Sequence, residues 1–433
     1  MKKIGLGLLS AALAVNIFVG SAVSNAATFG GSDGATSTQS ASSAGFKDTK
    51  GHWAEAAIKT AVEKGYVSGY TDGTFKPNAE VTRAEFLKML VAAMKLDTVA
   101  ANGSWYQPYV DAATKAGYYA NDFASTTWDK SIPRKEMSML AVRAGLTGYK
   151  KDYDTNRNLY EAAKNGIIQG VGKGEIAPDG VTTRASAVVV IERILDIKAG
   201  KTLATDKYAT AAAEVLWHKT NILTTLPKYF GKPWIADDGI DASELVSKSK
   251  DGVTVCSVRQ YVVIDLDDAN DPNRSLLSQY QLGWYDAVGT TFELNATKNA
   301  YAFIGIYDSK INGKFTPNAG KNYVSCSISI GNEYLDSVML RNTSKSATNP
   351  DGVYSVSEFK ANSDHKDYQS LVNFPDVTKY VTGGVTSGTI TTISGIIIDK
   401  DYLKNIPTGQ RINLSLSPIT NDNVTGIYST TVQ

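Results

Sequence analysis

The apolar positions follow two different patterns along the chain. From Phe46 to Ile197 they recur at spacings of three and four residues, which predicts amphipathic helices. A helical connector is expected over 199–225. Beyond it, short runs in which β-branched and aromatic residues alternate with polar ones predict strands separated by turns. The pattern therefore predicts a multidomain chain, mostly α in its first part and all-β in its second.

The helical part repeats one unit three times, with a period of about fifty residues. The copies run from Phe46 to Leu96, from Asn102 to Leu146 and from Tyr153 to Ile197. In each copy a first short helix is expected to end at a glycine, because a left-handed C-terminal cap favours a residue without a side chain. These glycines are Gly65, Gly117 and Gly166.

A second helix starts in each copy at an arginine that follows a capping position. In the first copy the hydroxyl of Thr82 can accept from a first-turn N–H while Glu85 reaches back to the cap, which is a capping box. The third copy begins in the same way at Thr183, with Ser186 in place of the glutamate, whereas the second begins at Pro133. The three arginines are Arg83, Arg134 and Arg184.

A loop joins the two helices of each copy, and it is rich in glycine in the first and third copies. It runs over Gly69–Pro77 in the first copy and over Gly170–Pro178 in the third. The second copy has Ala120–Phe123 at this place, without the glycine-rich turn. The second loop is therefore expected to differ from the other two.

Three such copies in register, covering about 150 residues, resemble tandem S-layer-homology modules. The hallmarks of that family are the Thr-Arg-Ala-Glu tetrad and the loop Gly-Tyr-x-Asp-Gly-x-Phe-x-Pro, and the first copy contains both. The resemblance implies a mostly helical, pseudo-threefold prism. It also implies that grooves between the repeats bind a pyruvylated secondary cell-wall polysaccharide of Gram-positive bacteria. The second copy departs most from the family pattern, so its groove is the weakest candidate.

The chemistry of such a ligand explains the residue types. A pyruvate ketal presents a carboxylate, which suits both the free N–H groups of a helix N-terminus and the planar fork of an arginine. Loop glycines let the backbone approach a sugar, and aromatic rings can stack on its face. The predicted polysaccharide-binding residues are Trp53, Gly69, Tyr70, Asp72, Gly73, Lys76, Arg83, Trp105, Arg134, Gly170, Lys173, Gly174 and Arg184. The predicted helix caps are Thr82, Glu85 and Thr183.

Alternatives stay open for these residues. Each arginine could instead form a salt bridge to a neighbouring repeat. Plain core packing is the favoured interpretation for Trp53 and Trp105, and capping alone explains Thr82 and Glu85. Among the arginines, Arg134 is expected to matter least for binding, because it belongs to the copy with the degenerate loop.

The start of the chain predicts export. Lys2 and Lys3 precede the apolar stretch Ile4–Val15, and Ser24-Asn25-Ala26 supplies the small residues of a signal-peptidase site. We expect cleavage before Ala27; a membrane helix is the alternative, but the apolar stretch is short for one. The predicted organisation is a signal peptide (1–26), a flexible linker (27–45), three modules (46–98, 99–150 and 151–198), the connector (199–225), a β-rich outer domain (226–380) and a terminal β region (381–433).

The terminal β region carries a second, shorter resemblance. From about Thr389 onward, Asp399–Leu403 and Pro407–Gly409 resemble the last strands of Ig-like X2 modules, which are found beside carbohydrate-binding domains. This resemblance spans about 45 residues and implies an Ig-like sandwich in the C-terminal region.

Composition narrows the function further. With 44 Lys and Arg against 43 Asp and Glu, the formal charge is +1, so nucleic-acid binding is not expected. Three His and two Cys leave few ligands for a Cys/His metalloenzyme. The sequence contains no nucleophile elbow, phosphate loop or dinucleotide motif. We therefore expect neither an enzyme nor an organic cofactor.

Two features of the β-rich part suggest specific hypotheses. Asp265, Asp267 and Asp268 offer the oxygen ligands that calcium prefers, although a solvated turn is the favoured interpretation, as it is for a second acidic cluster over 237–244. Cys256 and Cys326 each lie in a strand-like run. In an exported protein they most simply pair, with two buried thiols as the alternative.

Together these observations predict a secreted protein of the cell wall and cell surface, held by polysaccharide, with no membrane segment after signal cleavage. We expect the β-rich part to be displayed as an S-layer or S-layer-associated protein that can assemble into arrays. The alternatives are a wall-anchored carbohydrate-active enzyme and a carbohydrate-binding adhesin.

Overall fold

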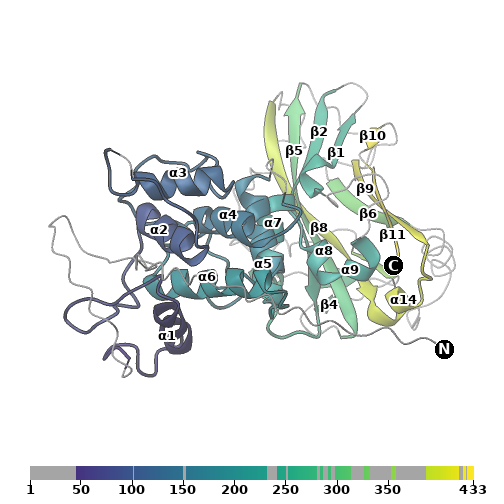
Figure 1. Cartoon of the computed structure of the whole chain (residues 1–433). Coiled ribbons are helices and arrows are strands. Elements are labelled where there is room, and N and C mark those ends of the chain that lie inside the picture. Colours follow the sequence, from purple (N-terminus) through teal and green to yellow (C-terminus); the bar gives the residue numbers. More distant parts are fainter. Residues whose placement is uncertain are drawn as a thin grey trace, which may run out of the picture.

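The structure is a computed structural model, which describes residues 45–100, 102–149, 153–231, 241–249, 252–279, 283–285, 291–293, 298–313, 326–331, 353–356, 387–418, 423–425 and 427–433. The predicted signal peptide, the linker up to residue 44, and Asp237 and Asp238 of the second acidic cluster lie outside these residues. Figure 1 shows a helical body beside a β-rich body, with α7 (Lys207–His218) between them.

Each repeat forms the two helices that its apolar pattern predicts. The first helices are α1 (Glu55–Glu63), α3 (Gln107–Lys115) and α5 (Thr155–Lys164). The second helices are α2 (Arg83–Ala93), α4 (Arg134–Gly145) and α6 (Arg184–Lys198). The glycine after each first helix has a positive φ, 77° at Gly65, 77° at Gly117 and 71° at Gly166. The first helices therefore end where a residue without a side chain is favoured.

The three repeats close into a ring. α2 packs on α3 of the second repeat, α4 packs on α5 of the third, and α6 returns to pack on α1 of the first. The returning contact is fixed by the carboxylate of Glu192 in α6, which accepts from Lys64 Nζ at 2.6 Å and from Tyr66 Oη at 2.9 Å. Because one hydrophobic cluster includes buried residues of all three repeats, the ring is a single folding unit.

A cycle of three backbone hydrogen bonds lies where the repeats meet. Val81 N donates to Thr182 O at 2.9 Å, Thr182 N donates to Ile132 O at 3.1 Å, and Ile132 N donates to Val81 O at 2.9 Å. All three residues are fully buried. Since buried amides need partners, the cycle requires all three repeats at once.

The connector leads from the ring into the β-rich part. α7 packs along α5, where the Trp217 ring lies 5.1 Å from the Tyr160 ring and 4.9 Å from the Arg157 guanidinium. The short helices α8 (Ile222–Thr225) and α9 (Pro227–Phe230) follow, and they contribute buried apolar side chains to the core of the β-rich part. The helical connector expected over 199–225 is therefore present, and it is packed on the third repeat.

In the described ranges, the strands form two antiparallel sheets and one separate pair. The six-stranded sheet has the order β10 (Asn423–Thr425), β1 (Val246–Ser249), β2 (Thr254–Asp265), β5 (Ala300–Asn312), β8 (Ser387–Asp399) and β7 (Val353–Val356). The three-stranded sheet has the order β11 (Ile427–Thr431), β9 (Arg411–Pro418) and β6 (Cys326–Gly331). The pair is β3 (Gly283–Tyr285) with β4 (Thr291–Glu293). In the described part of the chain, η1 (Ala242–Glu244) precedes β1, α10 (Arg274–Gln279) follows β2 and α14 (Lys400–Lys404) follows β8.

Two details of the strands differ from the sequence prediction. β2 is one long strand through Cys256, and its register with β5 shifts between Val258 and Gln260. At this β-bulge the side chains that face the cluster between the sheets change from even positions (Cys256, Val258) to odd positions (Tyr261, Val263), which a simple alternation does not predict. The expected boundary at residue 381 falls within one sheet, because β8 pairs with β5 from Ala300↔Asp399 to Asn312↔Ser387.

The two sheets pack face to face and are joined covalently. Phe303 and Tyr307 of β5 share one buried cluster with Leu414 and Leu416 of β9. Cys256 of β2 is disulfide-bonded, and the other cysteine of the chain is Cys326 of β6. The bond therefore links the six-stranded sheet to the three-stranded sheet across this core.

Candidate functional site

The N-terminus of each second helix lies against the loop region of the next repeat in the ring. In α6, Arg184 N donates to Ala79 O at 2.8 Å and Ala185 N donates to Pro77 O at 2.9 Å. α2 and α4 make the same two contacts with the second and third repeats, through Lys130 O, Trp128 O, Gly180 O and Pro178 O. These N–H groups were expected to be open to a polymer carboxylate. The structure corrects that expectation, because they donate to backbone carbonyls of the protein.

Two of the three arginines clamp the glycine-rich loop of the next repeat. Arg184 Nε donates to Phe75 O at 2.8 Å and Nη2 donates to Ser68 O at 3.2 Å. Arg134 repeats this with Ile176 O at 3.0 Å and Gln169 O at 2.6 Å. Each arginine thus ties both ends of a loop together, and burial lowers the pKa of both guanidinium groups.

The third arginine forms the inter-repeat salt bridge that was the alternative. Arg83 Nε donates to Glu136 Oε2 at 2.6 Å and Nη2 donates to Oε1 at 3.1 Å, and both side chains are at most 8% exposed. Glu136 occupies the position that Glu85 has in the first repeat. Glu85 completes the capping box with Thr82, but Pro133 has no N–H for Glu136 to cap. The freed carboxylate bonds Arg83 instead.

Because each arginine contacts the loop of the next repeat, the expected ranking of the arginines by their importance for polymer binding changes. The prediction assigned each arginine to the loop of its own repeat. In the structure Arg184 holds the loop of the first repeat, Arg134 holds that of the third, and Arg83 meets the degenerate loop of the second through Thr127 O at 3.3 Å. Arg83, not Arg134, therefore belongs to the weakest groove. A period in sequence does not show which neighbour a side chain reaches, so the sequence could not reveal this.

The loop Gly69–Pro77, the repeat-1 loop, presents a cation beside an aromatic ring. Lys76 is exposed, and its Nζ lies 4.0 Å from the centroid of the Tyr70 ring, which also lies 5.0 Å from the Arg184 guanidinium. Gly73 has a φ of 78° and open space where a side chain would stand. This surface combines the charge, the ring and the backbone access that an acidic sugar needs.

Side-chain carboxylates hold the repeat-1 loop in shape. Asp48 accepts from Phe75 N and Lys76 N, both at 2.8 Å. Asp72 accepts from the backbone N and the hydroxyl of Thr74, which lowers the pKa of Asp72. Asp72, a predicted ligand contact, is therefore a turn-forming residue here. Gly69 leaves room for the Phe46 ring, which a side chain at Gly69 would meet at 2.0 Å.

Trp53 and Trp105 are exposed, and the favoured interpretation of core packing is wrong for them. Trp53 is 66% exposed and Trp105 is 55% exposed. Trp53 lies just before α1, whose buried residues are Ile58 and Ala61. Its neighbour His52 bonds Asn78, just past the repeat-1 loop, at 3.3 Å. Trp53 therefore stands in the same region as the repeat-1 loop, available for contact.

The degenerate loop of the second repeat is filled by aromatic side chains. The Trp128 ring lies 5.3 Å from Tyr119, 5.5 Å from Tyr106 and 5.8 Å from Phe123. Asn121 takes a positive φ of 56°, which asparagine tolerates better than most residues. Where the other repeats have glycines, this repeat has a packed cluster.

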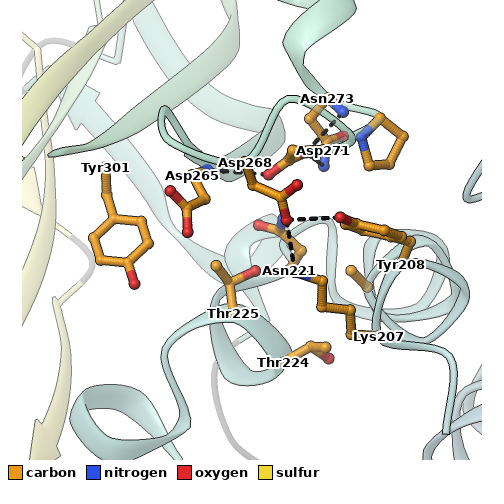
Figure 2. Close-up of a pocket in the computed structure, with 12 residues that line it drawn as sticks. Lys207, Tyr208, Asn221, Thr224, Thr225, Asp265, Asp268, Asp271, Asn273 and Tyr301 are labelled. Carbon is orange, nitrogen blue, oxygen red and sulfur yellow. Dashed lines mark hydrogen bonds and ion pairs between the residues drawn. The ribbon is translucent and has the colours of Figure 1, made fainter. Parts of the chain in front are cut away.

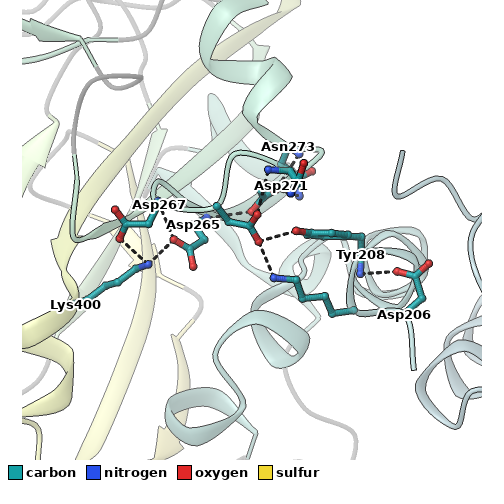
Figure 3. A network of polar contacts seen from close by, with 10 residues as sticks. Asp206, Tyr208, Asp265, Asp267, Asp271, Asn273 and Lys400 are labelled. Atoms are coloured by element: carbon teal, nitrogen blue, oxygen red, sulfur yellow. Dashed lines mark hydrogen bonds and ion pairs between the residues drawn. The ribbon is translucent and has the colours of Figure 1, made fainter. Parts of the chain in front are cut away.

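The predicted calcium ligands do not converge on one point. Asp265 and Asp267 both bond Lys400 Nζ, whereas Asp268 Oδ2 accepts from Lys207 Nζ and from Tyr208 Oη, each at 2.6 Å (Figure 3). These contacts lower the pKa of Asp268 to about 2. No cluster of three potential metal ligands occurs among the described residues. These carboxylates lie in the segment 265–273, the acidic loop, which joins β2 to α10. Lysines neutralise them, so the structure corrects the calcium hypothesis.

A small pocket lies beside the same acidic loop, between α7 and the end of β2 (Figure 2). Tyr208, Asn221, Asp268 and Tyr301 are among its lining residues. Asn221 exchanges hydrogen bonds with the Val263 backbone at 2.7 and 2.8 Å, so its amide is already used. The pocket is part of the seam between the connector and the β-rich part.

Two segments of this chain, 45–87 and 150–188, match the S-layer homology domain. They contain the repeat-1 loop and the loop Gly170–Pro178, together with α1 and α5. S-layer homology domains anchor proteins to the cell wall, and these matches place the chain at the cell surface, as the sequence predicted. No helix in the described residues is both long and apolar enough for a membrane span.

Three similar proteins each match about a third of this chain or less. Exoglucanase XynX of Acetivibrio thermocellus is 33% identical over 35% of this chain and 16% of its own length. Amylopullulanase of Thermoanaerobacterium thermosulfurigenes is 34% identical over 35% of this chain and 9% of its own. The S-layer protein of Bacillus thuringiensis subsp. finitimus is 33% identical over 24% and 13%. The chain thus spans less than a fifth of each of these relatives.

Proposed function

We propose that the ring of three repeats anchors this protein non-covalently to a pyruvylated secondary cell-wall polysaccharide. The observation that carries the proposal is the repeat-1 loop, where exposed Lys76 and the Tyr70 ring lie beside the open backbone of Gly73. A ketal carboxylate can pair with the ammonium group while the sugar ring contacts the aromatic face. In this proposal Arg184 acts indirectly, because its hydrogen bonds hold the repeat-1 loop in position.

We propose that the second repeat is also an S-layer homology module, so that the chain contains three of them. Support comes from the ring itself, in which α3 and α4 contact their neighbours as the helices of the matched segments do. It also comes from the cycle of buried hydrogen bonds, in which Ile132 stands equivalent to Val81 and Thr182. The closed arrangement supports the proposal of a pseudo-threefold prism.

We propose that the β-rich part is displayed outward for assembly or binding and is not an enzyme. Glycosidases are among the similar proteins, but the similarity is confined to the repeat region. The described sheets bury an apolar core between them. We also propose that the terminal strands are Ig-like. Support comes from β8 and β9, which belong to two different sheets of one unit, as strands of a sandwich do.

The substitution Lys76→Ala tests the binding surface directly. Loss of a charge-assisted contact of about 1.5 kcal/mol should weaken binding of a pyruvylated saccharide roughly tenfold. The side chain is exposed, so the melting temperature should stay the same. Lys50→Ala, another exposed lysine of the same repeat, is the matched control. Equal calorimetric affinities for the two variants would refute the proposed role of Lys76.

A further inference from the structure

Two glycines at equivalent loop positions have different surroundings. Gly73 of the repeat-1 loop has a φ of 78°, and a Cβ added there would have nothing within 4 Å. Gly174 of the loop Gly170–Pro178, the repeat-3 loop, has a φ of 75°, but a Cβ there would lie 2.7 Å from Pro272 Cγ and 3.1 Å from Tyr208 Cβ. The backbone is alike, and of these two glycines only Gly174 is covered.

The cover comes from outside the ring. Pro272 belongs to the acidic loop that follows β2, and Tyr208 belongs to α7. Asp268 joins these two elements, because its carboxylate accepts from both Lys207 and Tyr208 of α7 at 2.6 Å (Figures 2 and 3). α7 is in turn joined to the repeat-3 loop, since Gly170 N donates to Asp206 Oδ2 at 3.2 Å.

The acidic loop is braced internally, so it acts as a firm cover. Asp265 N donates to Asp271 Oδ2 at 3.0 Å, and Asn270 N donates to Asp268 Oδ1 at 3.0 Å. Lys207 and Lys400 pair with carboxylates of this loop, so the cover acts through its shape.

We propose that the β-rich part docks on the repeat-3 loop and closes the polymer-binding junction that this loop forms with Arg134. The junction of the repeat-1 loop with Arg184 stays open, and the aromatic cluster fills that of the second repeat. The inference rests on the proposed wall-polymer function and narrows it: one open junction per chain binds the polymer. The repeat-3 loop, including Gly170, Lys173 and Gly174, serves to hold the displayed part on its anchor.

Hydrogen exchange on the full chain tests the cover without any ligand. Tyr70 N donates to Thr74 O at 2.8 Å and Val171 N donates to Glu175 O at 2.9 Å, so the two amides form the same loop bond. Val171 is 55% exposed, but its amide bonds within the loop that Pro272 and Tyr208 contact at Gly174, so it should exchange roughly tenfold more slowly than the Tyr70 amide. The charge reversal Asp268→Lys, which faces Lys207, should remove the difference. Equal exchange of both amides in the unaltered protein would overturn the docking.

Calorimetric titration with a pyruvylated saccharide then tests the consequence for binding. The unaltered chain should bind close to one saccharide per chain, and Asp268→Lys should add a second binding event. Asp308→Lys, which breaks the ion pair of Asp308 with Arg259 at 2.8 Å on the β-rich part, should leave the stoichiometry unchanged. If Asp268→Lys fails to fold, Pro272→Ala takes its place in the test. This variant removes the ring next to Gly174 and should likewise add a second binding event.

The outcomes separate the two proposals. Two or more sites on the unaltered chain would overturn the closure of the repeat-3 loop, and so would a second site that appears equally with Asp308→Lys. Absence of saccharide binding, with slow exchange at Val171, would overturn the proposed ligand and leave the docking of the β-rich part standing.

Discussion

At the scale of single residues, the connector places one carboxyl group where it titrates near neutral pH. Glu214 of α7 is fully buried and accepts from Leu223 N and Thr224 N at 2.9 and 2.8 Å, which caps the start of α8. Burial raises the pKa of Glu214 to about 7, against the opposing effect of these hydrogen bonds. The carboxyl group thus links α7 to the helix that enters the β-rich part.

The pH dependence of stability follows from the sign of this shift. A pKa raised in the folded state means that the unfolded chain loses its proton first, so the free energy of unfolding falls as pH rises from about 4.5 to about 7. The loss due to Glu214 should amount to roughly 3 kcal/mol. Glu214→Gln should remove this component, as urea unfolding at pH 5 and pH 8 can show. The same pH dependence in the variant and in the unaltered chain would contradict the assignment.

Two glutamates at equivalent positions should differ in their energetic weight. Glu136→Ala leaves Arg83 as an unpaired buried charge and should cost about 3 to 5 kcal/mol of unfolding free energy. Glu85→Ala removes one cap contact and should cost about 1 kcal/mol. Thermal or denaturant unfolding measures both. A cost for Glu85→Ala equal to or above that for Glu136→Ala would show that the salt bridge is not the stronger interaction.

Local residue patterns predicted the helix caps well, but they did not predict which distant residues a side chain contacts. The capping box of Thr82 and Glu85 and the glycine caps depend on residues within one turn, so the sequence contains the information. Pro133 also signalled that Glu136 could not cap. The partners Arg83–Glu136 and Lys207–Asp268 are 53 and 61 residues apart, and their contact depends on how the whole repeats pack.

At the scale of elements, the disulfide joins two sheets that the strand pattern alone could not pair. A bond between Cys256 and Cys326 closes a loop of about 70 residues and should stabilise the β-rich part by roughly 4 kcal/mol in the chain-entropy view. Reduction should therefore lower the unfolding midpoint of the β-rich part. Alkylation of the unfolded, unreduced protein followed by intact mass gives the decisive check, and two labelled thiols would contradict the bond.

The elements also show where sequence periodicity misleads. The bulge between Val258 and Gln260 interrupts the alternation expected of a strand, and the pairing of β8 with β5 joins segments that were expected in separate domains. Helix boundaries were easier to predict, because caps and glycines mark them in the sequence. Strand order depends on contacts between distant segments, which no local pattern contains.

At the scale of the whole molecule, the ring and the β-rich part meet at a braced seam. α7 packs on the third repeat, while α8 and α9 enter the core of the β-rich part, so the connector is structural along its length. The sequence predicted the helical repeats, but the contact of Asp268 with α7 depends on how the two parts pack and could not be predicted from either part alone.

The central claim is that the ring holds this protein to wall polysaccharide, and co-sedimentation tests it most directly. The full chain should sediment with purified cell-wall sacculi and stay in solution with sacculi from which the secondary polysaccharide has been removed. Lys76→Ala should sediment less than Lys50→Ala at the same protein concentration. Equal sedimentation with intact and stripped sacculi would contradict the account, because peptidoglycan would then be the ligand.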